Sequence, residues 1–275
     1  MRKNWIYFLF IPCLVLILYF MMIPLIGTII PTFNDSGFSL KLYTDFFKDE
    51  YMLGIFYRTL KISLVSSIIC MIIGVPVSYY ISKTSQKLRG LFIALTVFPI
   101  LTNSVVRSFA WMSILGKNGV INNLLMKLNL INEPLSLMYT EGAIIVGTVY
   151  IFLPLMIISL IGVMENIEND LLEAAESLGA NKIIAFFKVV FPLSLPGLIV
   201  GTVLVFTGSL TAYTTPQLLG GNKNTVLATL IYQKTMTLGD WQGAAVVATI
   251  MIVTTLIVIK GINFLASRMD KRGVS

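Results

Sequence analysis

An acidic, amphipathic stretch between two apolar runs decides the fold of this chain. Residues 165–196 read ENIENDLLEAAESLGANKIIAFFKVVFPLSLP, after the run 142–164 and overlapping the run 193–215. Each run is mainly apolar and close to the roughly 20 residues that a transmembrane helix needs. Five acids lie between residues 165 and 176, and carboxylates are costly inside lipid. The pattern therefore predicts two transmembrane helices joined by a loop that lies in water.

The loop is predicted to fold as a helix, a glycine turn and a second helix. Asp170 and Glu173 have the spacing of a capping box at a helix start. Gly179 lies where a left-handed residue would end that helix, and Asn181 suits the N-cap of the next one. Between these positions an apolar stripe recurs at helical spacing, made of Leu171, Leu172, Ala175 and Leu178.

Something must cover this apolar stripe, and the residues leave three possibilities open. It could lie on the membrane surface, pack against helices of the same chain, or dock into a soluble partner. Helices that lie on a membrane are normally rich in Lys and Arg, so the acids of this loop argue against the first possibility. The small side chains of Ala174 and Ala175 favour docking into a groove of a partner protein.

The composition agrees with lipid as the solvent for much of the chain. Of 275 residues, 56% are hydrophobic and 12% charged, against roughly 45–50% and about 25% in soluble domains. A soluble enzyme, a disordered tail and a nucleic-acid binder are all poor interpretations. We predict an all-α membrane protein with a single transmembrane domain over residues 1–275. Its six transmembrane helices are expected at about 5–30, 60–82, 91–115, 142–164, 193–215 and 243–266.

The distribution of cations predicts the orientation. Arg2 and Lys3 precede the first span, and the short loop 83–90 carries Lys83, Lys87 and Arg89. Cytoplasmic loops carry an excess of Lys and Arg, so both termini are predicted to be cytoplasmic. The net charge of +7 then reflects topology and does not indicate an anionic ligand.

Several kinds of chemistry are disfavoured by residues that the sequence lacks. It has no histidine, and Cys13 and Cys70 lie in apolar runs, so a metal site of Cys and His is excluded and no cofactor is expected. The predicted spans have no interior Asp or Glu, which disfavours a membrane enzyme and an ion-coupled carrier. The chain has no P-loop either. Energy for uphill transport would therefore come from another polypeptide.

At the loop, the sequence resembles a known family. Glu173-Ala174-Ala175, followed by Gly179 and by Val189-x-Phe191-Pro192, is similar to the EAA motif in permease subunits of binding-protein-dependent ABC importers. Val189 and Phe191 stand where Ile and Leu are commoner. Four further stretches look like the spermidine/putrescine-type permeases, namely TNSVVRSFAW at 102–111, GVIN at 119–122, LLGG at 218–221 and GDW at 239–241.

The resemblance implies the type I importer architecture and a set of partners. Residues of about 165–192 would form the coupling loop that contacts a cytoplasmic ABC ATPase dimer. The chain would lie in the lipid bilayer of a bacterial plasma (inner) membrane. Its other partners would be a second homologous permease and an extracytoplasmic substrate-binding protein, and no nucleic acid is expected. The loop residues concerned are Asp170, Glu173, Ala174, Ala175, Gly179 and Pro192.

The resemblance also implies a function. The chain would form half of an alternating-access pathway for a small solute, and the polyamine-like stretches favour spermidine or putrescine. Thiamine, phosphonate, iron and opine importers share the architecture and stay as alternatives. A channel or secondary carrier is the remaining alternative of a different class.

Polar residues near the predicted outer ends of two spans are candidates for the solute pathway. Arg107 could instead reach the membrane surface or pair with an outer acid, and interfacial Tyr and Thr are common in any membrane protein. Trp111 or Tyr213 could offer an aromatic face to an amine. The full set is Arg107, Trp111, Ser209, Thr211 and Tyr213.

Three glycines in the fifth predicted span indicate close helix packing. Gly197 and Gly201 have the GxxxG spacing, and Gly208 follows two turns later. Small residues let helices approach closely in lipid. The partner helix could belong to this chain or to a second permease.

Overall fold

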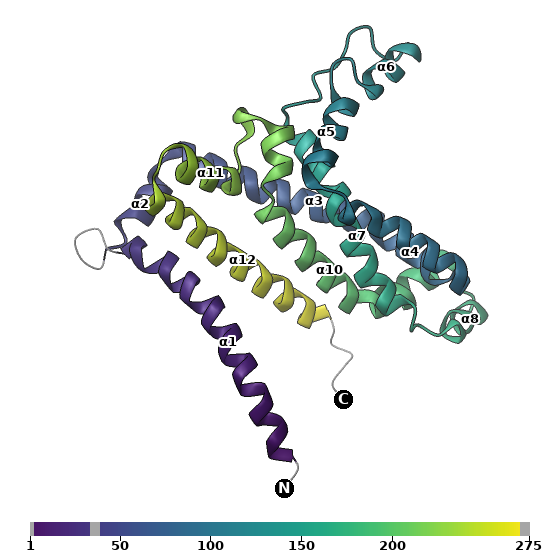
Figure 1. Ribbon diagram of the computed structural model, residues 1–275. Helices are drawn as coiled ribbons and strands as arrows, with labels where there is room; N and C mark the ends of the chain where they lie inside the picture. Colours follow the sequence, from purple (N-terminus) through teal and green to yellow (C-terminus); the bar gives the residue numbers. More distant parts are fainter. Residues whose placement is uncertain (1–2, 34–38, 270–275) are drawn as a thin grey trace. The chain divides into compact units, whose positions relative to one another are not determined.

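The computed structural model describes residues 3–33 and 39–269, and helices with short turns account for nearly all of them (Figure 1). Arg2, one of the cations behind the predicted orientation, lies outside these ranges. By its internal contacts the chain divides into two compact units. One holds the chain up to Gly54 together with Leu230–Val253, and the other holds Ile55–Thr229 and the chain from Thr254 onward.

The larger unit is built around α7 (Glu141–Met164), which packs against both α4 (Gln86–Leu101) and α10 (Phe191–Thr211). Thr140 starts α7 by accepting a hydrogen bond from the backbone N–H of Ala143 over 3.1 Å. Figure 1 shows α4, α7 and α10 running side by side. The core between α7, α10 and α3 (Glu50–Ser82) is apolar and contains Met156, Leu160 and Val205.

Most of α3 (Glu50–Ser82) also belongs to this unit and meets α7 through small side chains. The Ser78 hydroxyl donates to the carbonyl oxygen of Ile157 over 3.2 Å, and the Cys70 thiol donates to that of Val149 over 3.9 Å. Both pairs are 79 residues apart, so the two helices run parallel. The buried face of α3 follows helical spacing and includes Thr59, Ser63, Ser67, Cys70, Gly74, Ser78 and Ser82.

Shorter helices lie at the two ends of these long ones. α5 (Ser104–Leu115) and α6 (Val120–Lys127) follow α4. α8 (Asn169–Ser177), α9 (Lys182–Ala185) and the π-helical turn η2 (Phe186–Val190) connect α7 to α10. After α10 come η3 (Pro216–Gly220), η4 (Asn222–Asn224) and α11 (Leu227–Tyr232).

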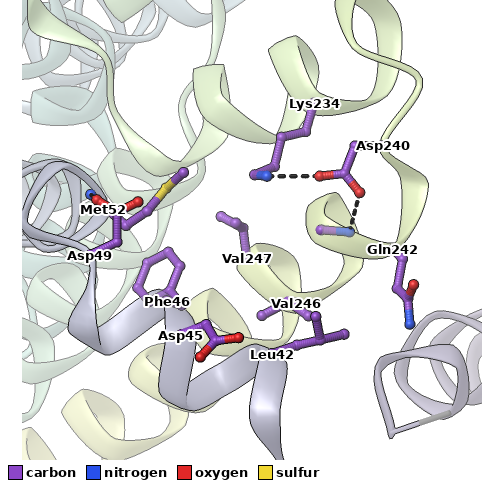
Figure 2. Close-up of a pocket in the computed structure, with 11 residues that line it drawn as sticks. Leu42, Asp45, Phe46, Asp49, Met52, Lys234, Asp240, Gln242, Val246 and Val247 are labelled. Atoms are coloured by element: carbon purple, nitrogen blue, oxygen red, sulfur yellow. Dashed lines mark hydrogen bonds and ion pairs between the residues drawn. The ribbon is translucent and has the colours of Figure 1, made fainter. Parts of the chain in front are cut away.

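The smaller unit contains α1 (Lys3–Ile29), η1 (Ile30–Phe33), α2 (Lys41–Lys48), η5 (Gln233–Thr237) and the first part of α12 (Trp241–Met269). Gln242 donates to the carbonyl oxygen of Pro31 over 3.0 Å, which ties α12 to η1. Figure 2 shows a pocket of about 240 Å³ in this unit, with Phe46 and Val247 among its lining residues. At one side of it, Lys234 pairs with Asp240 over 2.8 Å.

The spans agree with the predicted ones in number and approximate place, with one correction. Within the described residues, five helices are long and apolar enough to cross a membrane, and α4 with the segment Ser104–Lys127 counts as a sixth broken one. The expected continuous helix over 91–115 is wrong, because the chain bends there by 95°. Asn103 causes the break by capping α5, accepting hydrogen bonds from the N–H groups of Val105 and Val106 over 2.8 and 3.4 Å.

Candidate functional site

The helix α8 begins without the predicted capping box, and a lysine just after α3 contacts its first turn. Its N-cap is Glu168, whose side chain makes no capping hydrogen bond. Instead the ammonium of Lys83 donates to the side-chain oxygen of Asn169 over 2.5 Å and to the carbonyl oxygen of Ile167 over 3.2 Å. The capping box of Asp170 and Glu173 is therefore wrong, because α8 begins at Asn169, which places Asp170 inside its first turn.

The other end of α8 closes as predicted. Gly179 has a φ of +88°, the left-handed conformation that glycine adopts without a steric penalty. The N–H of Ala180 donates to the carbonyl oxygen of Ala175 over 3.1 Å, and that of Gly179 to Glu176 over 2.9 Å. These two bonds form a Schellman motif. Asn181 then caps α9 by accepting from the N–H of Ile184 over 2.8 Å, which confirms the second prediction for this turn.

The apolar residues of α8 divide between two faces. Leu172 packs against the core of the larger unit, and Ala175 is half-buried beside it. Leu171 and Leu178 point away from that core and are 45% and 90% exposed. With Ala174, which is also exposed, they form an outward stripe at spacings of three and four residues. The helix thus uses one face for its own chain and leaves another uncovered.

A cleft of about 530 Å³ lies beside α8. Tyr79 of α3 and Phe186 of η2 form part of its wall, with ring centroids 4.9 Å apart in an edge-to-face arrangement. Pro192 follows shortly after η2, inside the continuous helix Lys182–Thr211. The segment 165–192 is therefore anchored to α3 and α10, and its outward stripe, Leu171, Ala174 and Leu178, is free to receive a protein surface.

Arg107 has a different environment from the ones expected for its structural role. It is 7% exposed and pairs with no acid in the part of the chain that the structure describes. Its guanidinium donates to the carbonyl oxygens of Pro99 over 2.7 Å and Thr102 over 3.3 Å. Pairing with an outer acid is thus wrong among the described residues, since the charge caps the end of α4, whose last carbonyls have no helical partner. Reaching the membrane surface stays a prediction.

Arg107 also lines a cavity of about 230 Å³ together with Trp111 and Tyr150. The Trp111 and Tyr150 rings stand edge to face with centroids 5.5 Å apart. The structure therefore brings two of the five pathway candidates together.

The three candidates from the end of α10 are not among the residues that line this cavity. Ser209 is buried, and its hydroxyl has no hydrogen-bond partner among the described residues. Thr211 donates to the carbonyl oxygen of Thr207 in its own helix over 2.9 Å. Tyr213 follows the end of α10 and is half-buried. A role for these residues in solute passage stays a prediction.

The glycines of α10 all face α7. A Cβ atom at Gly197 would lie 2.6 Å from the carbonyl oxygen of Ser159, and one at Gly201 would lie 2.6 Å from the sulfur of Met156. At Gly208 it would overlap the ring of Phe152. The close approach therefore involves a helix of the same chain.

Two polar clusters were missed by the sequence analysis. Glu141, at the start of α7, pairs with Arg58 over 3.2 Å and with Lys61 over 2.9 Å, and Arg58 also donates to the carbonyl oxygen of Thr225. Arg89 pairs with Glu165 over 2.9 Å near the start of α8. In the sequence, each of these residues is recognisable only as a charge close to the end of a predicted span. Its partner, about 80 residues away, cannot be identified from the sequence.

The sequence is similar to a family of transport proteins and to named members of it. A family profile described as "Binding-protein-dependent transport system inner membrane component" matches residues 67–271. The spermidine/putrescine transport system permease protein PotB of Escherichia coli K12 is 32% identical over 267 residues, which cover 95% of this chain and 96% of that protein. The same-named protein of Salmonella typhimurium LT2 is also 32% identical, over 95% of this chain and 92% of the relative.

Solved structures share the fold. A bacterial ABC transporter involved in the import of the acidic polysaccharide alginate contains a chain that matches with a TM-score of 0.82 at 18% identity, covering 98% of this chain and 97% of the other. The MetNI methionine ABC transporter matches with a TM-score of 0.54 at 21% identity, over 80% and 97% of the two chains.

Proposed function

Because the chain belongs to the family of inner membrane components of binding-protein-dependent transport systems, we propose that it forms half of the alternating-access pathway of an ATP-driven polyamine importer. It is a permease subunit. We further propose its solute, its partners and the residues that couple it to ATP hydrolysis. The solute would be spermidine or putrescine, delivered by an extracytoplasmic binding protein to the outer side of a bacterial inner membrane.

The polyamine assignment is supported by relatives that span nearly the whole chain. Two proteins named as spermidine/putrescine permeases are 32% identical over 95% of it. A molybdenum transport permease of Azotobacter vinelandii is 27% identical over a shorter stretch of 173 residues, covering 63% of this chain. The longer and closer matches favour an organic polycation over an oxyanion.

The observation that carries the coupling role is the outward stripe of α8. Leu171, Ala174 and Leu178 stay exposed although Leu172, on the same short helix, is packed into the core. A helix that is fixed on one face and apolar on another suits a groove in a soluble protein, as in other helix-in-groove complexes. We assign that groove to a cytoplasmic ATPase dimer, with Asp170, Glu173, Ala174, Ala175, Gly179 and Pro192 as the loop positions implied by the family.

In this mechanism the chain performs no bond chemistry of its own. Closure of the ATPase dimer would displace α8, and the anchored segment 165–192 would carry the displacement to α3, α7 and α10. A second permease subunit would complete the pathway. The proposed orientation, with both termini in the cytoplasm, is supported by the contacts of Lys83 and Arg89 with the start of α8, since these cations and the acidic helix then share the cytoplasmic side.

The substrate test uses the importer reconstituted with its ATPase, second permease and binding protein in proteoliposomes. We expect ATP-dependent uptake of labelled putrescine or spermidine, competed by unlabelled polyamine and not by thiamine, phosphonate or molybdate. Uptake of one of those other solutes, without polyamine uptake, would overturn the substrate and keep the importer. Uptake that persists without any ATPase would support a channel or secondary carrier.

The coupling test changes the size of one residue on the outward stripe. Ala174→Trp is expected to abolish ATP-dependent uptake and to weaken co-purification of the ATPase, because the groove would have no room for an indole. Ala174→Ser is the matched control and should retain both properties. Equal uptake by the two variants would contradict the assignment of α8 as the contact with the ATPase.

A further inference from the structure

The start of α8 is held by two cations, Lys83 directly after α3 and Arg89 in the first turn of α4. Lys83 donates to the carbonyl oxygen of Ile167 and to the side chain of Asn169, and Arg89 pairs with Glu165 over 2.9 Å. These three partners occupy alternate positions of the turn that joins α7 to α8. The cations therefore hold one continuous piece of backbone from the side of α3 and α4.

The same turn is also fixed to α7. The side chain of Ile167 is buried in the core of the larger unit, and Asn166 donates to the carbonyl oxygen of Gly162 over 2.8 Å. The far end of α8 packs on α9 and η2 and leaves its outer face open. Leu178 is almost fully exposed, and a Cβ atom built on Gly179 would meet nothing within 4 Å. A force applied along the exposed face of α8 would therefore reach α3, α4 and α7 directly through its first turn.

Lys83 follows directly on α3, so its contacts join α8 to that helix. α3 runs parallel to α7 and bonds to it through Cys70 and Ser78, and at its other end Arg58 and Lys61 pair with Glu141. A displacement of the start of α8 must then move α3 and α7 together or break the contacts of Lys83. The contact between Arg89 and Glu165 makes the same connection to α4.

We propose that Lys83 and Arg89 are positioning residues that transmit the movement of α8 to α3 and α4. The inference rests on the proposed function, in which the ATPase moves α8. In this role the two cations do more than orient the chain in the membrane. Their loss would leave α8 able to bind the ATPase while its movement no longer reached the transmembrane helices to the same extent.

Lys87, at the start of α4 beside these two cations, provides a matched control. It is exposed and makes no ion pair or side-chain hydrogen bond within the ranges that the structure covers. Removing its charge takes one cation from the group that favours a cytoplasmic location of this segment, as does removing the charge of Lys83 or Arg89. A difference between these variants therefore reports the contacts and not the count of cations.

The test measures solute imported per ATP hydrolysed by the complete importer in proteoliposomes. We expect Lys83→Met and Arg89→Gln to lower this ratio about fivefold or more, in the range of ordinary coupling energies. Lys87→Met should stay within about twofold of the original protein, a change of about 0.4 kcal/mol or less. ATPase co-purification should be unchanged in all three. Lys83→Arg, which keeps a donor, should recover most of the ratio.

A charge exchange separates the contact from general damage to folding. Arg89→Glu alone should lower the ratio, and adding Glu165→Arg should restore it. Failure of the double variant to restore it, or an equal loss in Lys87→Met, would overturn the proposal. If Ala174→Trp abolishes coupled uptake while Lys83→Met and Arg89→Gln leave the ratio unchanged, the role of the two cations fails and the proposed function stands. If Ala174→Trp is also without effect, the proposed coupling role of α8 fails as well.

Discussion

Arg107 of α5 donates a hydrogen bond to the carbonyl oxygen of Pro99 in α4 over 2.7 Å, across the break between the two helices. The last carbonyls of α4 have no partner within the helix, and no water is available inside lipid to supply one. The contact lets the chain bend by 95° without leaving those groups unsatisfied. The charge of Arg107 is thereby used within the fold, and its side chain still borders the cavity beside Trp111.

Replacing this arginine should destabilise the permease. Arg107→Met removes the guanidinium that donates to the carbonyls of Pro99 and Thr102, although the Thr102 hydroxyl still donates to Pro99 over 2.8 Å. Losing hydrogen bonds from a charged group costs about 1.5–3 kcal/mol. We expect a lower thermal unfolding midpoint in detergent, with Arg107→Lys in between. Lys117→Met, which removes an exposed cation from the same region, is the control and should unfold as the original protein does. An unchanged midpoint in Arg107→Met would contradict the capping role.

A bulky residue at Gly179 should uncouple transport and leave membrane insertion intact. The φ of +88° is unfavourable for a β-branched side chain, so Gly179→Val would distort the Schellman turn at the end of α8. Gly179→Asn should be milder, because asparagine tolerates the left-handed region better than other residues do. The readout is ATP-dependent uptake alongside the amount of protein in the membrane.

Gly162→Ala is the control for that experiment. Gly162 lies in α7 with open space around its Cα, and its φ is not positive. We expect normal uptake, since alanine is the better helix former. Normal uptake by Gly179→Val as well would show that the turn is not required.

The contact between α10 and α7 should not tolerate a large side chain. At Gly201 a Cβ would overlap the hydroxyl of Ser159 and approach the sulfur of Met156. Gly201→Leu is therefore expected to cost about 1–3 kcal/mol or to prevent accumulation of the folded protein. Gly261→Leu in α12, where the space beside the Cα is open, should accumulate normally. Thermal unfolding and yield from membranes would measure both.

The ion pair of Lys234 and Asp240 should give the smaller unit a dependence on pH. The hydrogen bond from Lys234 holds the pKa of the Asp240 carboxyl below its ordinary value of 3.8, opposed by partial burial and helped by the N–H of Gly243. A lowered carboxyl pKa adds stability that is complete above the ordinary value and is lost as the pH falls through the folded one. The midpoint temperature of thermal unfolding of the original protein should therefore decrease as the pH is lowered from about 5 to about 3.

Lys234→Met tests the origin of that dependence. Its midpoint should lie below that of the original protein at neutral pH, and the difference should shrink as Asp240 becomes protonated. Lys41→Met, an exposed cation of the same unit, should leave the pH profile unchanged. A difference that is constant from pH 7 to pH 3 would mean that the pair does not contribute through its charge.

Part of the site could be predicted because its signals are local. The turn at Gly179 depends on hydrogen bonds between residues a few positions apart, and glycine is the residue that its backbone conformation favours. The start of α8 could not be predicted in the same way. Lys83 lies 86 residues before Asn169, so the local sequence does not show this contact, and the capping box that the sequence suggested does not form.

The sequence by itself determined which segments are apolar enough to lie in lipid and where the acidic loop interrupts them, because hydropathy and helical periodicity act over neighbouring residues. Only the tertiary structure decided that the helix of the third span breaks at Asn103, that Arg107 caps the end of α4, and that Lys83 and Arg89 hold the start of α8. Each of these depends on groups that meet through folding, and their distances are not encoded in any one window of the chain. The physical reason is that a buried charge or an unpaired carbonyl takes whichever partner the packed helices bring near.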